Sequence, residues 1–221
     1  MRRATEADDE LVAEALALAF ADDPGWAHLL PAGDSAARGE RLLAFFSAEI
    51  ANLVPDWREV WVTEDGSGAA VWARPGQWRV PFTRTLRAAP QMHRVFGRRL
   101  ALAIWALLRL ERLHPSAPEH FYLHYLGVLP ERQGRGLGSM LLRPVLEHCD
   151  SHGLPAFLES STERSAALYT GSGFDLTATF HMPAGGPLLR QMWRRPQAIA
   201  PGADTGIDAG HGLSPAQARR A

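Results

Sequence analysis

Lysine is missing from this chain: all 23 basic residues among its 221 positions are arginine. The P-loop of many nucleotide-binding proteins requires a lysine after its second glycine, so this absence excludes a P-loop. The 24 acidic residues nearly balance the arginines, and the net charge is −1. Such a balance gives no reason to expect binding to nucleic acid or to an anionic membrane.

Cysteine and long apolar runs are also scarce. Cys149 is the single cysteine, so a disulfide within the chain is excluded, which suits a reducing cytoplasm. The most apolar run, residues 100–108, has arginines on both sides and is too short to span a bilayer. We therefore expect a cytoplasmic protein without a transmembrane helix.

The remaining composition is that of a globular protein, with 46% apolar and 21% charged residues. We expect one domain over residues 1–196, with a helical insertion at 82–113. Residues 197–221 contain almost no large apolar side chains, so we expect a disordered tail there.

Periodicity and turn residues predict the other elements. We expect strands at 2–5, 57–63, 68–73, 121–128, 155–160, 174–181 and 188–193. We expect helices from Asp8 onward and at 35–53, 137–151 and 163–172, and a long helical segment at 82–112, broken near Pro90 and Gly97.

The most informative stretch is a strand followed by a glycine-rich turn. Alternation places Phe121, Leu123 and Tyr125 on one face of the strand, and Tyr122, His124, Leu126 and Val128 on the other. The turn Gln-Gly-Arg-Gly-Leu-Gly-Ser, residues 133–139, then enters a helix. Unpaired backbone N–H groups and the positive end of the helix dipole favour an anion such as phosphate at this position.

Two interpretations of this turn are open. Gly134 and Gly136 fit the first two glycines of a dinucleotide-binding fingerprint, and Glu159 follows at about the expected spacing of 20 residues, but Ser139 stands at the third glycine. Alternatively, Gln133, Gly136 and Gly138 match Q-x-x-G-x-G and resemble the acyl-CoA signature of the GNAT superfamily of N-acetyltransferases. Leu168-Tyr169 followed by Gly173-Phe174 resembles a second signature of that superfamily. Residues 60–75 and 155–174 resemble its puromycin N-acetyltransferase-like members most closely.

This resemblance implies an α+β fold with a mixed, twisted sheet of about seven strands and helices on both faces. The implied activity is transfer of an acetyl group from acetyl-CoA to a primary amine of a small molecule, by direct attack in a ternary complex. Alternatives are a non-catalytic acyl-CoA-binding or sensor module on the same fold, and an acetyltransferase for protein or peptide amines. We expect a monomer or homodimer. We expect no metal, because the pair His148 and His152 lacks a third ligand nearby.

The resemblance also assigns site residues. The exposed strand edge at Leu126, Gly127 and Val128 would hold the pantetheine arm of the cofactor. The remainder of the cofactor would be held by Gln133, Gly134, Arg135, Gly136, Leu137, Gly138, Ser139 and Thr162. Tyr169 would protonate the thiolate leaving group, because a phenol stays protonated at neutral pH. His124 is the preferred base for the acceptor amine, with Glu119, His120 and Glu159 as lesser candidates. Trp26 and Tyr122 would contact the acceptor.

Overall fold

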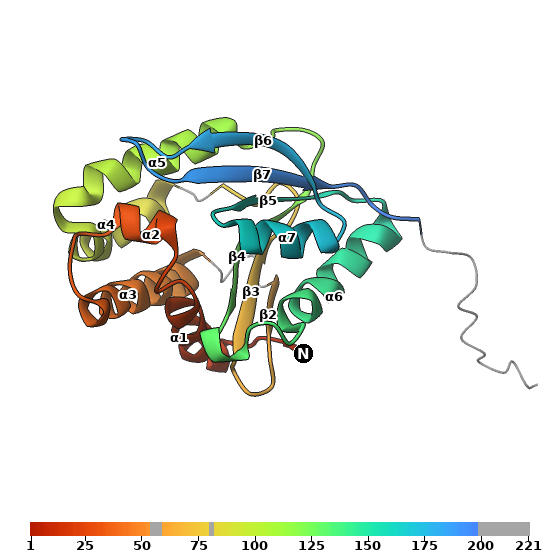
Figure 1. Cartoon of the computed structure of the whole chain (residues 1–221), viewed down its shortest axis with the longest axis horizontal. Coiled ribbons are helices and arrows are strands. Elements are labelled where there is room, and N and C mark those ends of the chain that lie inside the picture. The colour runs from red at the N-terminus through yellow and green to blue at the C-terminus, as the bar shows by residue number, and fades with distance from the viewer. Residues whose placement is uncertain (54–58, 80–81, 199–221) are drawn as a thin grey trace, which may run out of the picture.

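A computed structural model describes residues 1–53, 59–79 and 82–198 (Figure 1). These residues form a seven-stranded sheet of order β1-β2-β3-β4-β5-β7-β6. The strands are β1 (Arg2–Arg3), β2 (Glu59–Val62), β3 (Gly68–Ala73), β4 (Phe121–Val128), β5 (Ala156–Ser160), β6 (Asp175–His181) and β7 (Leu188–Arg194). The β4–β5 pair is parallel and the other pairs are antiparallel, so the predicted mixed sheet is confirmed.

Helices cover both faces of the sheet, as predicted. They are α1 (Asp9–Ala19), α2 (Pro24–Leu29), α3 (Ser35–Leu53), α4 (Phe82–Phe96), α5 (Leu100–Leu113), α6 (Leu137–His152) and α7 (Glu163–Gly171), with short 3-10 turns η1 (Glu6–Asp8), η2 (Gly97–Arg99) and η3 (Pro130–Arg132). One apolar core lies between α1, α3 and strands β2 and β3, and a second joins α6 and α7 to β3, β4 and β5. In the described part of the chain, every helix is too short or too polar to cross a membrane.

The observed bounds agree with most of the predicted elements. Helix α3 and strand β3 have the predicted limits. The expected break at Gly97 is present as η2, but the break expected at Pro90 is wrong, because α4 continues through that residue. The first two positions of the strand expected at 57–63, and residues 199–221 of the expected tail, lie outside the described residues.

A β-bulge in β4 contradicts the predicted alternation of its side chains. Val71 of β3 is opposite Tyr125 and Trp72 is opposite Leu123, so His124 is an extra residue in the ladder. Beyond it the faces are exchanged: Tyr125 packs on the α1–α3 core, while Leu126 and Val128 pack on the α6–α7 core. A bulge depends on the partner strand and is not visible in the alternation of one strand.

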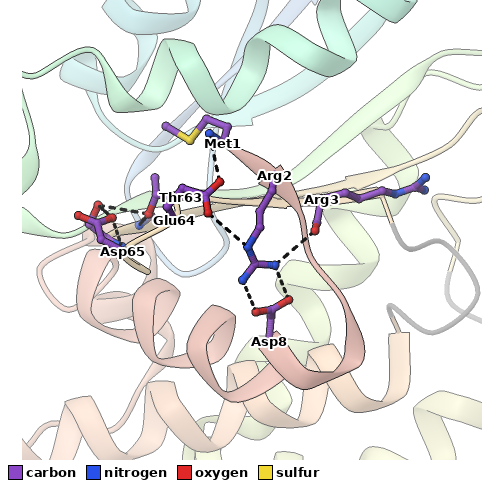
Figure 2. Close-up of polar contacts among 9 residues, drawn as sticks. Met1, Arg2, Arg3, Asp8, Thr63, Glu64 and Asp65 are labelled. Atoms are coloured by element: carbon purple, nitrogen blue, oxygen red, sulfur yellow. Dashed lines mark hydrogen bonds and ion pairs between the residues drawn. The ribbon is translucent and has the colours of Figure 1, made fainter.

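The N-terminal segment is fastened by one charged cluster (Figure 2). The Arg2 guanidinium donates to both carboxylate oxygens of Asp8, at 2.8 and 2.5 Å. Asp8 also accepts from the backbone N–H of Thr5 at 2.8 Å and from its hydroxyl at 2.9 Å. These bonds hold the pKa of the Asp8 carboxyl well below its ordinary value. The cluster therefore joins strand β1 to the start of α1.

Candidate active site

The sheet opens between β4 and β5. Their ladder contains Phe121, Tyr122 and Leu123, paired with residues 156–158, and ends there although β4 continues to Val128. In Figure 1, β5, β7 and β6 diverge from β2, β3 and β4 beyond this point. A cavity of about 980 Å³ extends along the open edge, and Leu126, Gly127 and Val128 line it. An open strand edge can pair with an extended ligand as an added strand would.

The glycine turn borders the same cavity. Gly134 and Gly136 have φ values of +77° and +79°, and an added Cβ at either would meet no atom within 4 Å. The backbone conformation, not crowding, therefore requires glycine there. Gln133 closes the turn by donating its side-chain N–H to the Val128 carbonyl at 3.0 Å. Among the described residues, no backbone hydrogen bond from the amides of 134–139 is present, so they are available to an anion.

Most of the predicted site residues come together at this cavity. Its lining includes Trp26, Tyr122, His124, Leu126, Gly127, Val128, Gln133, Gly134, Gly136, Leu137, Gly138, Thr162 and Tyr169. Arg135 and Ser139 are exposed and their side chains do not contribute to the lining. The Thr162 hydroxyl accepts from the backbone N–H of Ser165 at 3.1 Å and thereby caps α7. Arg164 also borders the cavity and adds positive charge near the turn, as does Arg132, whose guanidinium donates to Asp65 at 3.1 Å.

Acetyl-CoA fits these groups. The free amides and arginines suit its phosphates, and the open β4 edge suits its pantetheine arm. Helix α7 approaches the turn closely at Gly138, where an added Cβ would lie 2.9 Å from Cδ2 of Leu168 and would have to displace that side chain.

Tyr169 lies on α7 and is almost completely buried, with 6% of its surface exposed. Burial, and to a lesser extent the charge of Asp23, raise the pKa of its phenol above the ordinary value. The hydroxyl therefore stays protonated at neutral pH and can act as a donor toward the cavity that Tyr169 lines.

Asp23 is a site residue that the sequence analysis missed. One carboxylate oxygen caps α2 by accepting from the N–H groups of Gly25 at 2.8 Å and Trp26 at 3.1 Å. The other accepts from the Ser161 hydroxyl, in the loop between β5 and α7. Asp23 thus joins the loop that carries Trp26 to the loop before Tyr169. Asp23 before the helix-starting Pro24 is a capping signal in the sequence.

Two candidate bases line the cavity and differ in proton affinity. Burial lowers the pKa of His124 to about 3, so this imidazole takes up a proton poorly at neutral pH. Burial raises the pKa of the Glu159 carboxyl to about 7, against the opposing effects of hydrogen bonds with Tyr122 and Gln191. A base with a pKa near the working pH is the more effective one, which favours Glu159 over His124.

The two other candidate bases are placed elsewhere. Glu119 is exposed and away from the cavity lining. His120 is 3% exposed and donates from Nδ1 to the Pro118 carbonyl at 2.8 Å, so its Nε2 accepts from Nε2 of His114 at 3.0 Å. His114 does line the cavity, stacked on Trp78 with ring centroids 3.7 Å apart. This pair of histidines brings residues of the helical insertion against β4, and its spacing of six residues matched no motif.

Comparison with known proteins agrees with this geometry. Residues 56–174, more than half of the chain, match the acetyltransferase (GNAT) family. The chain belongs to the GNAT family of acetyltransferases.

The matched relatives share only part of their length with this chain. It is 37% identical over 95 residues to the N-alpha-acetyltransferase RimI of Mycobacterium tuberculosis, which is 42% of this chain and 58% of that protein. It is 41% identical over 54 residues to an uncharacterised N-acetyltransferase of Schizosaccharomyces pombe, or 24% and 22% of the two chains. The chain therefore spans less than two thirds of the length of these curated relatives.

Two solved structures extend the likeness over most of the chain. A Corynebacterium glutamicum protein described as histone acetyltransferase HPA2 and related acetyltransferase has a TM-score of 0.67 at 24% identity, covering 90% of this chain and 97% of that one. The Drosophila melanogaster polyamine N-acetyltransferase has a TM-score of 0.56 at 20% identity, covering 88% and 98%. At these identities the likeness establishes a shared fold.

Proposed function

We propose that this protein transfers the acetyl group of acetyl-CoA to a primary amine of a small molecule, by direct attack in a ternary complex. One observation carries the proposal. The open β4 edge, the free amides of the glycine turn, a buried tyrosine and a partly buried carboxyl group all border one cavity. A site of this kind can hold a thioester next to both a proton acceptor and a proton donor.

The proposed roles follow from the pKa values and positions of the side chains. When bound, acetyl-CoA supplies a thioester carbonyl. Glu159 accepts a proton from the incoming ammonium, which frees the lone pair of the nitrogen. The C–N bond forms as the C–S bond breaks. The Tyr169 hydroxyl gives its proton to the departing sulfur, and the second proton released by the acylated nitrogen restores the phenol. Cys149 is buried, and burial raises the pKa of its thiol to about 12, so we assign it no acyl-enzyme role.

A thiol-release assay with acetyl-CoA and a panel of small amines tests this proposal directly. We expect free CoA to appear only when an amine is present, with the acetylated amine formed in equal amount by mass spectrometry. Binding of acetyl-CoA without turnover of any amine would instead support the non-catalytic binding module. Stabilisation by NADH but not by CoA would support a dinucleotide enzyme.

The puromycin-like segments favour an aminated antibiotic as one member of this panel. The near-neutral charge of the chain gives no separate indication of a basic protein substrate.

A second candidate function is acetylation of protein N-terminal amines. It is favoured by the similarity to an N-alpha-acetyltransferase over 95 residues. Side chains of the helical insertion, from α4 and α5, line one side of the cavity. Their presence there favours a small acceptor. N-terminal peptides belong in the same assay, and faster turnover of a peptide than of every small amine would favour the second candidate.

A further inference from the structure

A second partly buried carboxyl group lies in the cavity, on a different element from Glu159. Glu49 of α3 lines the cavity, and one of its oxygens accepts from the Tyr125 hydroxyl at 3.3 Å. Burial raises the pKa of this carboxyl to about 8, although the hydrogen bond from Tyr125 acts to lower it. Arg84 also lines the cavity, but it donates to the Asn52 carbonyl at 2.9 Å, at the end of α3.

Aromatic rings line the same cavity as this carboxyl group. Phe20, Trp26, Phe45 and Tyr125 all line the cavity. The Trp26 and Phe45 ring centroids are 4.5 Å apart, and those of Phe20 and Tyr125 are 6.3 Å apart. The faces of aromatic rings attract cations, and a buried carboxylate without a matching positive charge is costly. This wall of the cavity therefore suits a cationic group.

We propose that Glu49 binds a second cationic nitrogen of the acceptor, so that the enzyme prefers diamines and polyamines to monoamines. The proposal rests on the amine acetyltransferase function above. It adds a specificity-determining residue outside the groups assigned to the chemistry.

The bulge in β4 determines how the two tyrosines beside these carboxyl groups are placed. It brings Tyr122 and Tyr125 onto one face of the strand, where Tyr122 interacts with Glu159 and the Tyr125 hydroxyl donates to Glu49. Because of the bulge, Tyr122 and Tyr125 lie opposite Ala73 and Val71, which are two positions apart on β3, or about 7 Å of strand. One nitrogen of an extended diamine can then lie at Glu159 for acetylation while the other lies at Glu49.

Putrescine and butylamine form a matched pair of probes, because they have the same carbon chain and differ in the second amine. A charge-assisted hydrogen bond makes kcat/KM for putrescine roughly 10- to 100-fold higher than for butylamine in the unaltered protein. Glu49→Gln should remove most of that preference and leave butylamine almost unchanged. Glu40→Gln, an exposed substitution on the same helix, is the control and should alter neither amine.

The possible results distinguish a failure of the proposed Glu49 role from a failure of the proposed acetyltransferase function. Equal turnover of both amines by the unaltered protein would overturn the role of Glu49 and leave the acetyltransferase function standing. A preference for putrescine that survives in Glu49→Gln would also overturn it. If no amine or peptide is acetylated, the proposed function fails and this inference fails with it. The comparison of amines in the unaltered protein does not depend on the folding of any variant.

Discussion

The two ends of the cavity are built in different ways. At the cofactor end, β4, the glycine turn and α6 follow one another along the chain, and the turn needs its glycines because of its own backbone angles. At the acceptor end, side chains converge from the α1–α2 loop, α3, α4, α5 and β4, across about 100 residues of sequence. A site made from consecutive residues leaves a recognisable pattern in the sequence, whereas a site assembled by packing of distant segments does not.

The largest effect is expected where the two ends meet, at Tyr169. Tyr169→Phe removes the proposed proton donor while keeping the ring in its buried position. We expect kcat to fall by roughly 10²-fold or more, with little change in the affinity for acetyl-CoA. Steady-state kinetics and calorimetry with CoA measure the two quantities. Unchanged turnover would remove Tyr169 from the mechanism.

The next largest effect concerns the base. With a pKa of about 7, Glu159 is active when deprotonated, so kcat/KM should rise with pH and level off above about 7. Glu159→Gln should lower kcat/KM by roughly 10²-fold and abolish this dependence. Glu147→Gln, exposed on α6, is the matched control. A profile that disappears instead in His124→Asn would restore His124 as the base.

These two residues also show how far sequence reasoning reached. Tyr169 was identified because Leu168-Tyr169 and Gly173-Phe174 form one short pattern on α7 and its exit. Glu159 was named only as a lesser base, because its proton affinity depends on burial by elements far away in sequence. His124 was preferred on its ordinary pKa, which the buried environment of β4 lowers. The ranges of the strands and helices were predicted well, since alternation and turn residues report local structure, whereas the mixed seven-stranded sheet was implied by the family resemblance.

The acceptor end shows why the remainder was not predictable. Glu49 is one of two acidic residues on α3, and its distinction from exposed Glu40 appears only when the helix packs beside Tyr125. The direction of the Tyr125 side chain follows from the bulge opposite β3, which strict alternation misassigned. Interactions of this kind depend on partners that a local pattern does not contain.

A smaller effect should be confined to the cofactor end. Gly136→Ala places an alanine at φ +79°, which costs about 1–2 kcal/mol and shifts the amides of the turn. We expect a rise of about tenfold in KM for acetyl-CoA, equivalent to roughly 1.4 kcal/mol of binding free energy. Gly153→Ala is the matched control, because Gly153 ends the same helix at φ +66° and also has open space around it. It should lose similar stability without a change in KM, and an equal rise in KM would contradict an anion site at the turn.

The smallest effect should be seen away from both ends, at the cluster in Figure 2. The pKa of Asp8 is lowered chiefly by its hydrogen bonds with Arg2 and Thr5, so the charged carboxylate stabilises the folded state above its ordinary pKa of 3.8. That stabilisation is lost as the pH falls below this value, because the folded state must then take up a proton at a depressed pKa. Asp8→Asn should therefore lower the melting temperature slightly at neutral pH, and the difference should shrink in acid. KM for acetyl-CoA and for the amine should both stay unchanged, and a change in either would mean that the two ends of the cavity depend on how β1 and α1 are joined.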